Sequence, residues 1–98
     1  MNVVFSPQAR QELVDAANYL ELQYEGLGER FRLETKRALK LITLHPKAWA
    51  VDRDEIRKCL LHRFPYKILY SIEPGYIFII AIAHQHREPD YWFSRSRS

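Results

Sequence analysis

The side chains best suited to acid–base chemistry lie in the second half of this 98-residue chain. They are lysines, histidines, an arginine and a tyrosine: Lys58, Lys67, His84, His86, Arg87 and Tyr91. Cleavage of an RNA phosphodiester can use the 2′-hydroxyl as an internal nucleophile. An enzyme then needs only a base, an acid and cations that hold the developing negative charge. These groups are of the required kinds, so acid–base work on a phosphodiester is the most plausible catalytic hypothesis.

Each of these side chains also has a purely structural interpretation. Lys58 and Lys67 fit the solvated side of two strands, and His84 is placed to satisfy a backbone group where a strand ends. Arg87 can form a local ion pair with the acidic residues that follow it. The aromatic run that begins at Tyr91 can cover an exposed edge of the core. Composition alone therefore does not establish an enzyme.

Other catalytic or cofactor chemistry has little support in the sequence. His84-x-His86 is accompanied by no CxxC or HExxH motif and by no carboxylate at ligand spacing, so we expect no metal site and no cofactor. The single cysteine, Cys59, cannot form an internal disulfide, and in an alternating strand it is best interpreted as a small core residue. The serines lack the context of a nucleophile, and there is no glycine-rich phosphate loop.

Three β-rich segments are expected to position these groups, over residues 56–63, 66–72 and 76–83. Residues 66–72 show the two-residue period of a strand with one buried face. Residues 76–83 are apolar on both faces, as in a central strand. The connection Glu73-Pro74-Gly75 is a turn, because Pro fixes φ at one corner and Gly accepts the positive φ needed next.

The first half of the chain predicts a short strand and two helices. Residues 2–5 are β-prone, and Ser6-Pro7 has the chemistry of an N-cap and a first helical position. Apolar residues at three- and four-residue spacing then predict helices over 7–25 and 28–44. The short glycine-containing connection between them makes an antiparallel hairpin.

The order β-α-α-β-β-β predicts an α+β fold for a single domain over residues 1–98. A helical hairpin is expected to pack on one face of an antiparallel sheet. We further expect a loop from Trp49 to Glu55 and a short helix over residues 89–93.

The turn at residues 73–75 also predicts which side chains share a face of the sheet. If Ile72 pairs with Tyr76 or Ile77, the wholly apolar face that meets the helices is Tyr66, Ile68, Tyr70, Ile72, Ile77, Ile79, Ala81 and Ala83. The opposite face is then half-apolar and edged with cations and histidines: Lys58, Leu60, His62, Lys67, Leu69, Ser71, Phe78, Ile80, Ile82 and His84. A slip of one residue would exchange the two faces.

Composition is that of a globular protein with a modest positive charge. Hydrophobic residues make up 47% and charged residues 28% of the chain, and the formal net charge is +3. No apolar run approaches the length of a membrane span, and no secretion leader is recognisable, so we expect a cytoplasmic location and no membrane partner. The positive excess lies in the sheet and tail, which suits an acidic partner.

Residues 56–92 resemble a known family. They contain the pattern R-K-x-L, then F-P-Y-x-I-x-Y-x-I, then I-x-I-x-A-I-x-H-x-x-R-x-P-x-Y-W. A β-α-α segment that starts Ser6-Pro7-x-Ala9 precedes them. This combination is similar to the RelE/ParE superfamily of toxins from type II toxin–antitoxin systems. The resemblance covers essentially the whole chain. It implies growth arrest and plasmid stabilisation by one of two routes: RelE-like members cut mRNA on the ribosome, whereas ParE-like members poison DNA gyrase. A non-toxic interaction module of the same fold is the remaining alternative.

The resemblance implies catalytic residues only for the RelE-like alternative, at Lys58, Lys67, His84, Arg87 and Tyr91. Three departures weaken that alternative. Leu60 stands where the nucleases place a second lysine, and Gln85 where they place an arginine. Lys67 stands where they have an arginine; this replacement keeps the positive charge but loses the planar fork suited to phosphate oxygens. The long helical hairpin and the H-x-x-R tail favour the ParE-like branch.

The resemblance also implies a partner. It is a cognate antitoxin whose acidic, partly disordered C-terminal segment folds on the toxin. The toxin is expected to reach operator DNA only through this antitoxin. A half-apolar sheet face left bare would be a liability, so we expect the antitoxin to cover it. The expected antitoxin-binding residues are Leu60, Lys67, Leu69, Ile80, Ile82, Arg87 and Trp92.

Overall fold

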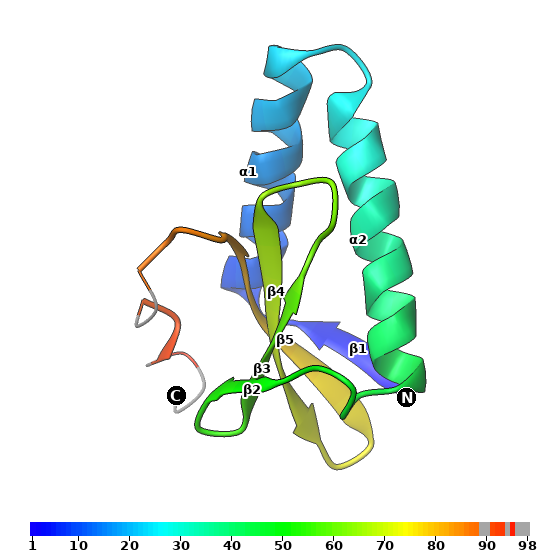
Figure 1. Cartoon of the computed structure of the whole chain (residues 1–98), viewed down its shortest axis with the longest axis vertical. Helices are drawn as coiled ribbons and strands as arrows, with labels where there is room; N and C mark the ends of the chain where they lie inside the picture. The colour runs from blue at the N-terminus through cyan, green and yellow to red at the C-terminus, as the bar shows by residue number, and fades with distance from the viewer. Residues whose placement is uncertain (89–90, 94, 96–98) are drawn as a thin grey trace.

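The computed structural model describes residues 1–88, 91–93 and 95. The predicted α+β fold is confirmed, with two helices packed on a five-stranded sheet (Figure 1). The elements in chain order are β1 (Asn2–Phe5), α1 (Pro7–Gln23), α2 (Leu27–Leu44), β2 (Val51–Arg53), β3 (Ile56–Leu60), β4 (Tyr66–Glu73) and β5 (Tyr76–His84).

Ser6 fixes the start of α1 against the sheet. Its hydroxyl accepts a hydrogen bond from the Ala9 N–H (3.0 Å) and donates one to the Ile80 carbonyl (3.1 Å), while its own N–H donates to the Ile79 carbonyl (3.0 Å). The predicted N-cap at Ser6 and the Pro7 that follows it are therefore confirmed. The helix ends at Gln23, two residues before the predicted end at residue 25.

The connection between the helices is held by Glu21. Its carboxylate accepts hydrogen bonds from the N–H groups of Gly26 (2.8 Å) and Gly28 (3.0 Å), so an anion sits at the positive end of α2. Gly26 has a φ of 85°, which favours glycine. A Cβ on Gly28 would lie 2.5 Å from the Ala17 carbonyl oxygen, so the two helices approach too closely here for any side chain.

The sheet has the strand order β1-β5-β4-β3-β2. The strands from β2 to β5 are antiparallel neighbours, but β1 pairs with β5 in parallel, so the sheet is mixed and the prediction of a wholly antiparallel sheet was wrong at this edge. Parallel strands need a crossover connection, and nearly the entire chain lies between β1 and β5.

Besides the end of α1, three segments differ from the prediction by more than one residue. Strand β2 lies within the segment expected to be a loop; it is only three residues long and fully exposed, so it has no alternation to reveal it. Strand β3 ends at Leu60 rather than at residue 63, and the Arg63 N–H beyond it donates to the Glu34 carboxylate of α2 (3.1 Å). Residues 89 and 90 of the expected helix over 89–93 lie outside the described residues, and Tyr91 and Trp92 form a turn.

A β-bulge in β5 changes the predicted faces of the sheet. Tyr70 pairs with Ile79, but Leu69 pairs with Ala81, so Ile80 is an extra residue. Because a bulge shifts the side-chain alternation by one, every residue after it changes sides. Ile77 and Ile79 face the helices as predicted, but the assignment of Ala81, Ile82, Ala83 and His84 was wrong: Ile82 and His84 lie on the helix side, and Ala81 and Ala83 on the open side.

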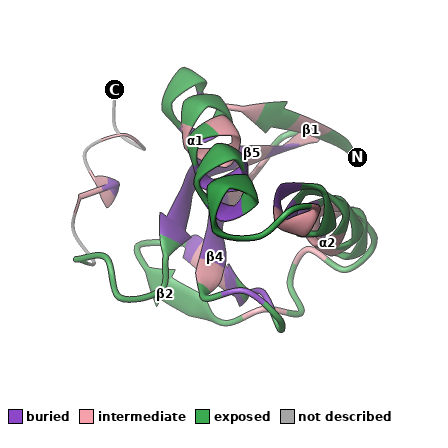
Figure 2. Ribbon diagram, turned by 90° about the horizontal axis from the view of Figure 1, so that it is seen from above, coloured by how far each residue is buried: buried purple, intermediate pink, exposed green. Residues whose placement is uncertain are grey.

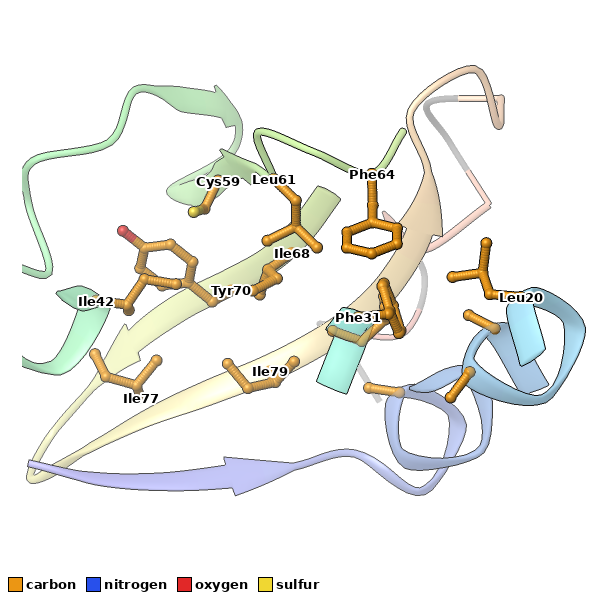
Figure 3. Close-up of a cluster of buried hydrophobic side chains, with 14 residues drawn as sticks. Leu20, Phe31, Ile42, Cys59, Leu61, Phe64, Ile68, Tyr70, Ile77 and Ile79 are labelled. Atoms are coloured by element: carbon orange, nitrogen blue, oxygen red, sulfur yellow. The ribbon is translucent and has the colours of Figure 1, made fainter. Parts of the chain in front are cut away.

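The main core lies between the helices and the sheet. Phe31 of α2 is fully buried and packs edge-on against Phe64 (ring centroids 5.4 Å apart) and beside Tyr66 (5.0 Å). Figure 3 shows the rings of Phe31 and Phe64 with Ile68, Tyr70, Ile77 and Ile79 of the sheet. The Tyr70 hydroxyl donates to the Pro46 carbonyl (2.6 Å), which satisfies the only polar atom of a buried phenol.

Candidate functional site

The face of the sheet away from the helices, here called the open face, carries the predicted cations. The β3–β4 register places Lys58 opposite Leu69 and Leu60 opposite Lys67, so these four side chains share the open face. Lys58 pairs with Asp52 of β2 (Nζ to Oδ1, 3.3 Å). Leu60 is half exposed, but Leu69 is fully buried. The structure therefore brings together the two lysines of the expected site.

The described part of the C-terminal segment, residues 91–93 and 95, covers the middle of the open face. Trp92 has no exposed surface and packs with Ile56, Leu69, Ile80 and Ala81 in a second hydrophobic cluster. Figure 2 shows this segment and α2 on opposite sides of β4. The interpretation of the aromatic run as a cover for the core is confirmed for Trp92. The expectation that this face is bare is wrong at Leu69 and Ile80, because Trp92 covers both; antitoxin binding there stays a prediction.

Glu12 of α1 holds this segment in place. Its carboxylate accepts hydrogen bonds from the Tyr91 hydroxyl (3.0 Å), from both guanidinium nitrogens of Arg95 (3.1 and 3.2 Å) and from the Ile82 N–H (3.1 Å). At the other end, the Arg53 guanidinium of β2 stacks on the Phe93 ring (4.3 Å). The segment thus spans the open face from α1 to β2.

Glu12 is not among the residues that the sequence predicts for the site. A signal was present, since Glu12 lies three residues after Ala9 and next to Leu13, on the apolar stripe of α1. A charged residue on a buried stripe requires a partner inside the fold. One of the partners of Glu12 is the N–H of Ile82. Ile82 lies after the bulge in β5 and beyond residues 76–79, which pair with β1.

Lys67 is the most enclosed charge of the open face. It is 5% exposed, its amine lies 4.7 Å from the Trp92 ring centroid, and it donates to the Gln85 carbonyl (3.3 Å). Burial, and then the positive charge of Lys58, lower the pKa of Lys67, while Asp52 acts in the opposite direction. Its ammonium is therefore partly committed to contacts within the chain.

His84 does not join the two lysines. It lies opposite Tyr66 on the helix side of the sheet, with the two rings 5.5 Å apart. Its Nδ1 accepts a hydrogen bond from the His86 N–H (3.2 Å), so the interpretation that His84 satisfies a backbone group at the strand end is confirmed. Ile82 is buried in the main core and offers no surface to a partner.

Arg87 and Tyr91 contact each other. The Arg87 guanidinium lies 4.1 Å from the centre of the Tyr91 ring, and Arg87 itself is exposed. Burial, and then the negative charge and hydrogen bond of Glu12, raise the pKa of the Tyr91 phenol. To act as an acid or base on a substrate, Tyr91 would first have to leave Glu12.

The arrangement can bind anions more readily than it can transfer protons. Lys58 and Lys67 place two ammonium groups on one face, with Arg87 on the segment beside them. The histidine that would act as base lies on the other side. Among residues 1–88, 91–93 and 95, no group of three or more His, Cys, Asp or Glu side chains is arranged to hold a metal ion. In the same residues, no helix is long and apolar enough to cross a membrane.

The hairpin-on-sheet fold is that of the RelE/ParE superfamily of toxins. A sequence model of the family described as "ParE toxin of type II toxin-antitoxin system, parDE" matches residues 3–89, so the chain belongs to the ParE toxin family and is a type II toxin with an antitoxin partner. A comparison with curated proteins gives no match.

A solved structure supports the fold. A chain of the chromosomal ParDE toxin–antitoxin system from P. aeruginosa is similar, with a TM-score of 0.62 and 12% sequence identity. The match covers 86% of this chain and 95% of that one. At this identity the likeness concerns the fold alone.

Proposed function

We propose that this ParE-family toxin arrests growth in the cytoplasm by inhibiting DNA gyrase, and that it does not cut mRNA. The proposal is supported by membership of the ParE toxin family, because the ParE-like branch, which the sequence resembles, poisons DNA gyrase. The antitoxin neutralises the toxin by binding it, and only through the antitoxin does the toxin reach operator DNA.

The observation that carries the proposal is the separation of Lys67 and His84 by the bulge at Ile80. A phosphodiester nuclease must bring a base, an acid and cations to the same phosphate. Here the histidine is on the helix side, the tyrosine is bound to Glu12, and the enclosed lysine is bound to Gln85. The groups that the nuclease hypothesis needs are thus present but do not converge.

Ribosome-dependent mRNA cleavage is the second candidate. It is favoured by the shared face of Lys58 and Lys67 and by the lowered pKa of Lys67, because an amine with a lowered pKa is better suited to proton transfer. If this candidate is correct, replacing Lys67 must abolish cleavage while the fold remains intact.

The decisive experiment presents purified toxin with both targets. In one arm, gyrase supercoils relaxed plasmid in the presence of increasing toxin. In the other, ribosomes programmed with a defined mRNA are incubated with the same toxin, and the mRNA is mapped for cuts. The toxin premixed with its antitoxin is the matched control in both arms. We expect loss of supercoiling, restored by antitoxin, and intact mRNA; cuts in mRNA that depend on ribosomes, with supercoiling unaffected, would overturn the proposal.

A further inference from the structure

The outer side of α2 carries three basic side chains in line, Arg32, Lys36 and Lys40, here called the basic row. Residues at four-residue spacing lie on one side of a helix, about 6 Å apart along its axis. All three are exposed. Figures 1 and 2 show α2 and the described C-terminal segment on opposite sides of the molecule, so the basic row lies away from the open face.

The positive charge of the chain is concentrated in this helix. α2 contains five basic and two acidic residues, so its net charge of +3 equals that of the whole chain. The other helix of the hairpin, α1, contains one basic and three acidic residues. The two helices therefore present surfaces of opposite sign, and that of α2 suits a partner with many negative charges.

The basic row does not stabilise the helix that carries it. Like charges four residues apart repel each other, and the row contains two such pairs, Arg32 with Lys36 and Lys36 with Lys40. No basic residue lies in the last turn of α2, where the helix dipole would favour it. Within residues 1–88, 91–93 and 95, no member of the row makes an ion pair. Charges that cost stability and have no partner inside this part of the fold indicate a partner outside it.

The chemistry of the row suits phosphate groups better than a protein surface. The same strip of α2 continues with Glu29 before the row and Thr43 after it, so it has no apolar member to anchor a protein. Lysine is depleted from protein interfaces, whereas it is a common ligand of phosphate. Duplex DNA carries one negative charge per about 1.7 Å of its axis, so about seven charges lie along the roughly 12 Å from Arg32 to Lys40. A straight helix can therefore bring each of the three cations to a phosphate.

We propose that the basic row of α2 binds the phosphate backbone of duplex DNA without reading its sequence. Each of the three cations neutralises one phosphate and releases the counterions bound there. Such contacts position a protein on DNA but carry no sequence information, so the antitoxin remains the route to the operator. The DNA contact itself does not depend on the target of the toxin. Its role rests on the proposed function: a toxin bound to gyrase would also hold the DNA that gyrase carries.

The test titrates a fluorescently labelled DNA duplex with full-length toxin freed from its antitoxin, and follows anisotropy at several salt concentrations. With three phosphate contacts, the logarithm of the association constant should fall against the logarithm of salt concentration with a slope of about −2.7. Lys36→Gln/Lys40→Gln removes two contacts, so the slope should become about −0.9 and the dissociation constant at low salt should rise roughly tenfold or more. The matched control, Lys47→Gln/Arg63→Gln, removes two exposed charges outside the row and should keep the slope of the unmodified chain.

The same variants separate binding from folding. Because the charges of the row repel each other, Lys36→Gln/Lys40→Gln should unfold at the same urea concentration as the unmodified chain or at a higher one. A lower urea midpoint would show that the row stabilises the fold, and would overturn the inference of an outside partner. An unchanged salt slope in this variant would overturn the proposal, as would a slope reduced instead by Lys58→Gln on the open face. Tighter binding to single-stranded RNA of the same length, or loss of antitoxin affinity with the salt slope unchanged, would likewise assign the row to another partner and refute it.

A supercoiling assay connects the DNA contact to gyrase. For Lys36→Gln/Lys40→Gln, half inhibition at low salt should need about tenfold more toxin than for the unmodified chain, and the difference should shrink as salt rises. The Lys47→Gln/Arg63→Gln control should inhibit like the unmodified chain. A toxin that binds DNA through the row but leaves gyrase active would refute the proposed function and not the DNA contact. A toxin that inhibits gyrase but binds no DNA would refute the DNA contact alone.

Discussion

Replacing Trp92 with Ala tests whether the C-terminal segment is part of the folded domain. The indole is fully buried against Ile56, Leu69, Ile80 and Ala81. A tryptophan buries about 150–250 Å², which at about 25 cal/mol per Å² corresponds to about 4–6 kcal/mol. This is an upper limit, because the unfolded chain already shields part of that surface, and because a detached segment regains about 1–2 kcal/mol of backbone entropy per residue.

We therefore expect Trp92→Ala to lower the free energy of unfolding by about 3 kcal/mol, near the low end of measured large-to-small core substitutions of tryptophan. For a domain of this size that corresponds to a fall in Tm of about 12–24 °C. Urea unfolding followed by far-UV circular dichroism measures the change, and Trp49 remains as a fluorescent reporter of the helix side.

Two companion variants separate the contributions. Trp92→Phe keeps one aromatic ring and loses the second ring of the indole with its N–H, which has no hydrogen-bond partner in the described residues, so it should cost less than half as much as Ala. Tyr91→Phe removes the hydrogen bond to Glu12 and should cost about 1 kcal/mol. A Trp92→Ala protein whose urea midpoint and m-value match those of the unmodified chain would refute the packing of this segment on the open face.

Three further predictions concern the hairpin, alkaline stability and the partner. Gly28→Ala should cost about 1–3 kcal/mol in urea unfolding, because its Cβ would meet the Ala17 carbonyl at 2.5 Å, whereas an unchanged midpoint would show that the helices can separate freely. Burial raises the pKa of the Cys59 thiol from 9.0 to about 11. Its contribution to stability is complete below pH 9 and is lost as the pH rises towards 11, by up to about 3 kcal/mol; Cys59→Ala should flatten the decline of Tm over that range, and an equally steep decline would contradict this. Arg87→Glu should weaken antitoxin binding about threefold, because it reverses an exposed positive charge that suits an acidic partner. Titration at low salt measures the dissociation constant, and an unchanged value would contradict this prediction.

The fold was predictable because local chemistry and periodicity agree over most of the chain. Ser6-Pro7 starts α1, the glycines after Glu25 end it, and Glu73-Pro74-Gly75 makes a turn, each for a reason contained in a few residues. The parallel pairing of β1 with β5 could not be derived in this way, since it depends on contacts between the two ends of the chain. Strand β2 is too short and too exposed to have a pattern.

The site was less predictable because one residue decides its geometry. The segment Ile77–Ala83 is apolar at every position, so no alternation marks where Ile80 leaves the ladder. A strand with polar residues on one side would have revealed the change. Consequently Lys58 and Lys67 were correctly placed together, while Ile82 and His84 were assigned to a surface that they do not reach.

The bulge at Ile80 also connects the fold to the choice of function. By turning both Ile80 and Ala81 to the open face, it provides the apolar floor on which Trp92 packs. The same change of phase turns Ile82 and His84 towards the helices, and it leaves the Ile82 N–H to be satisfied by Glu12, which in turn holds Tyr91. A single extra residue thus both closes the sheet face with the chain's own tail and separates the groups that a nuclease would need to bring together.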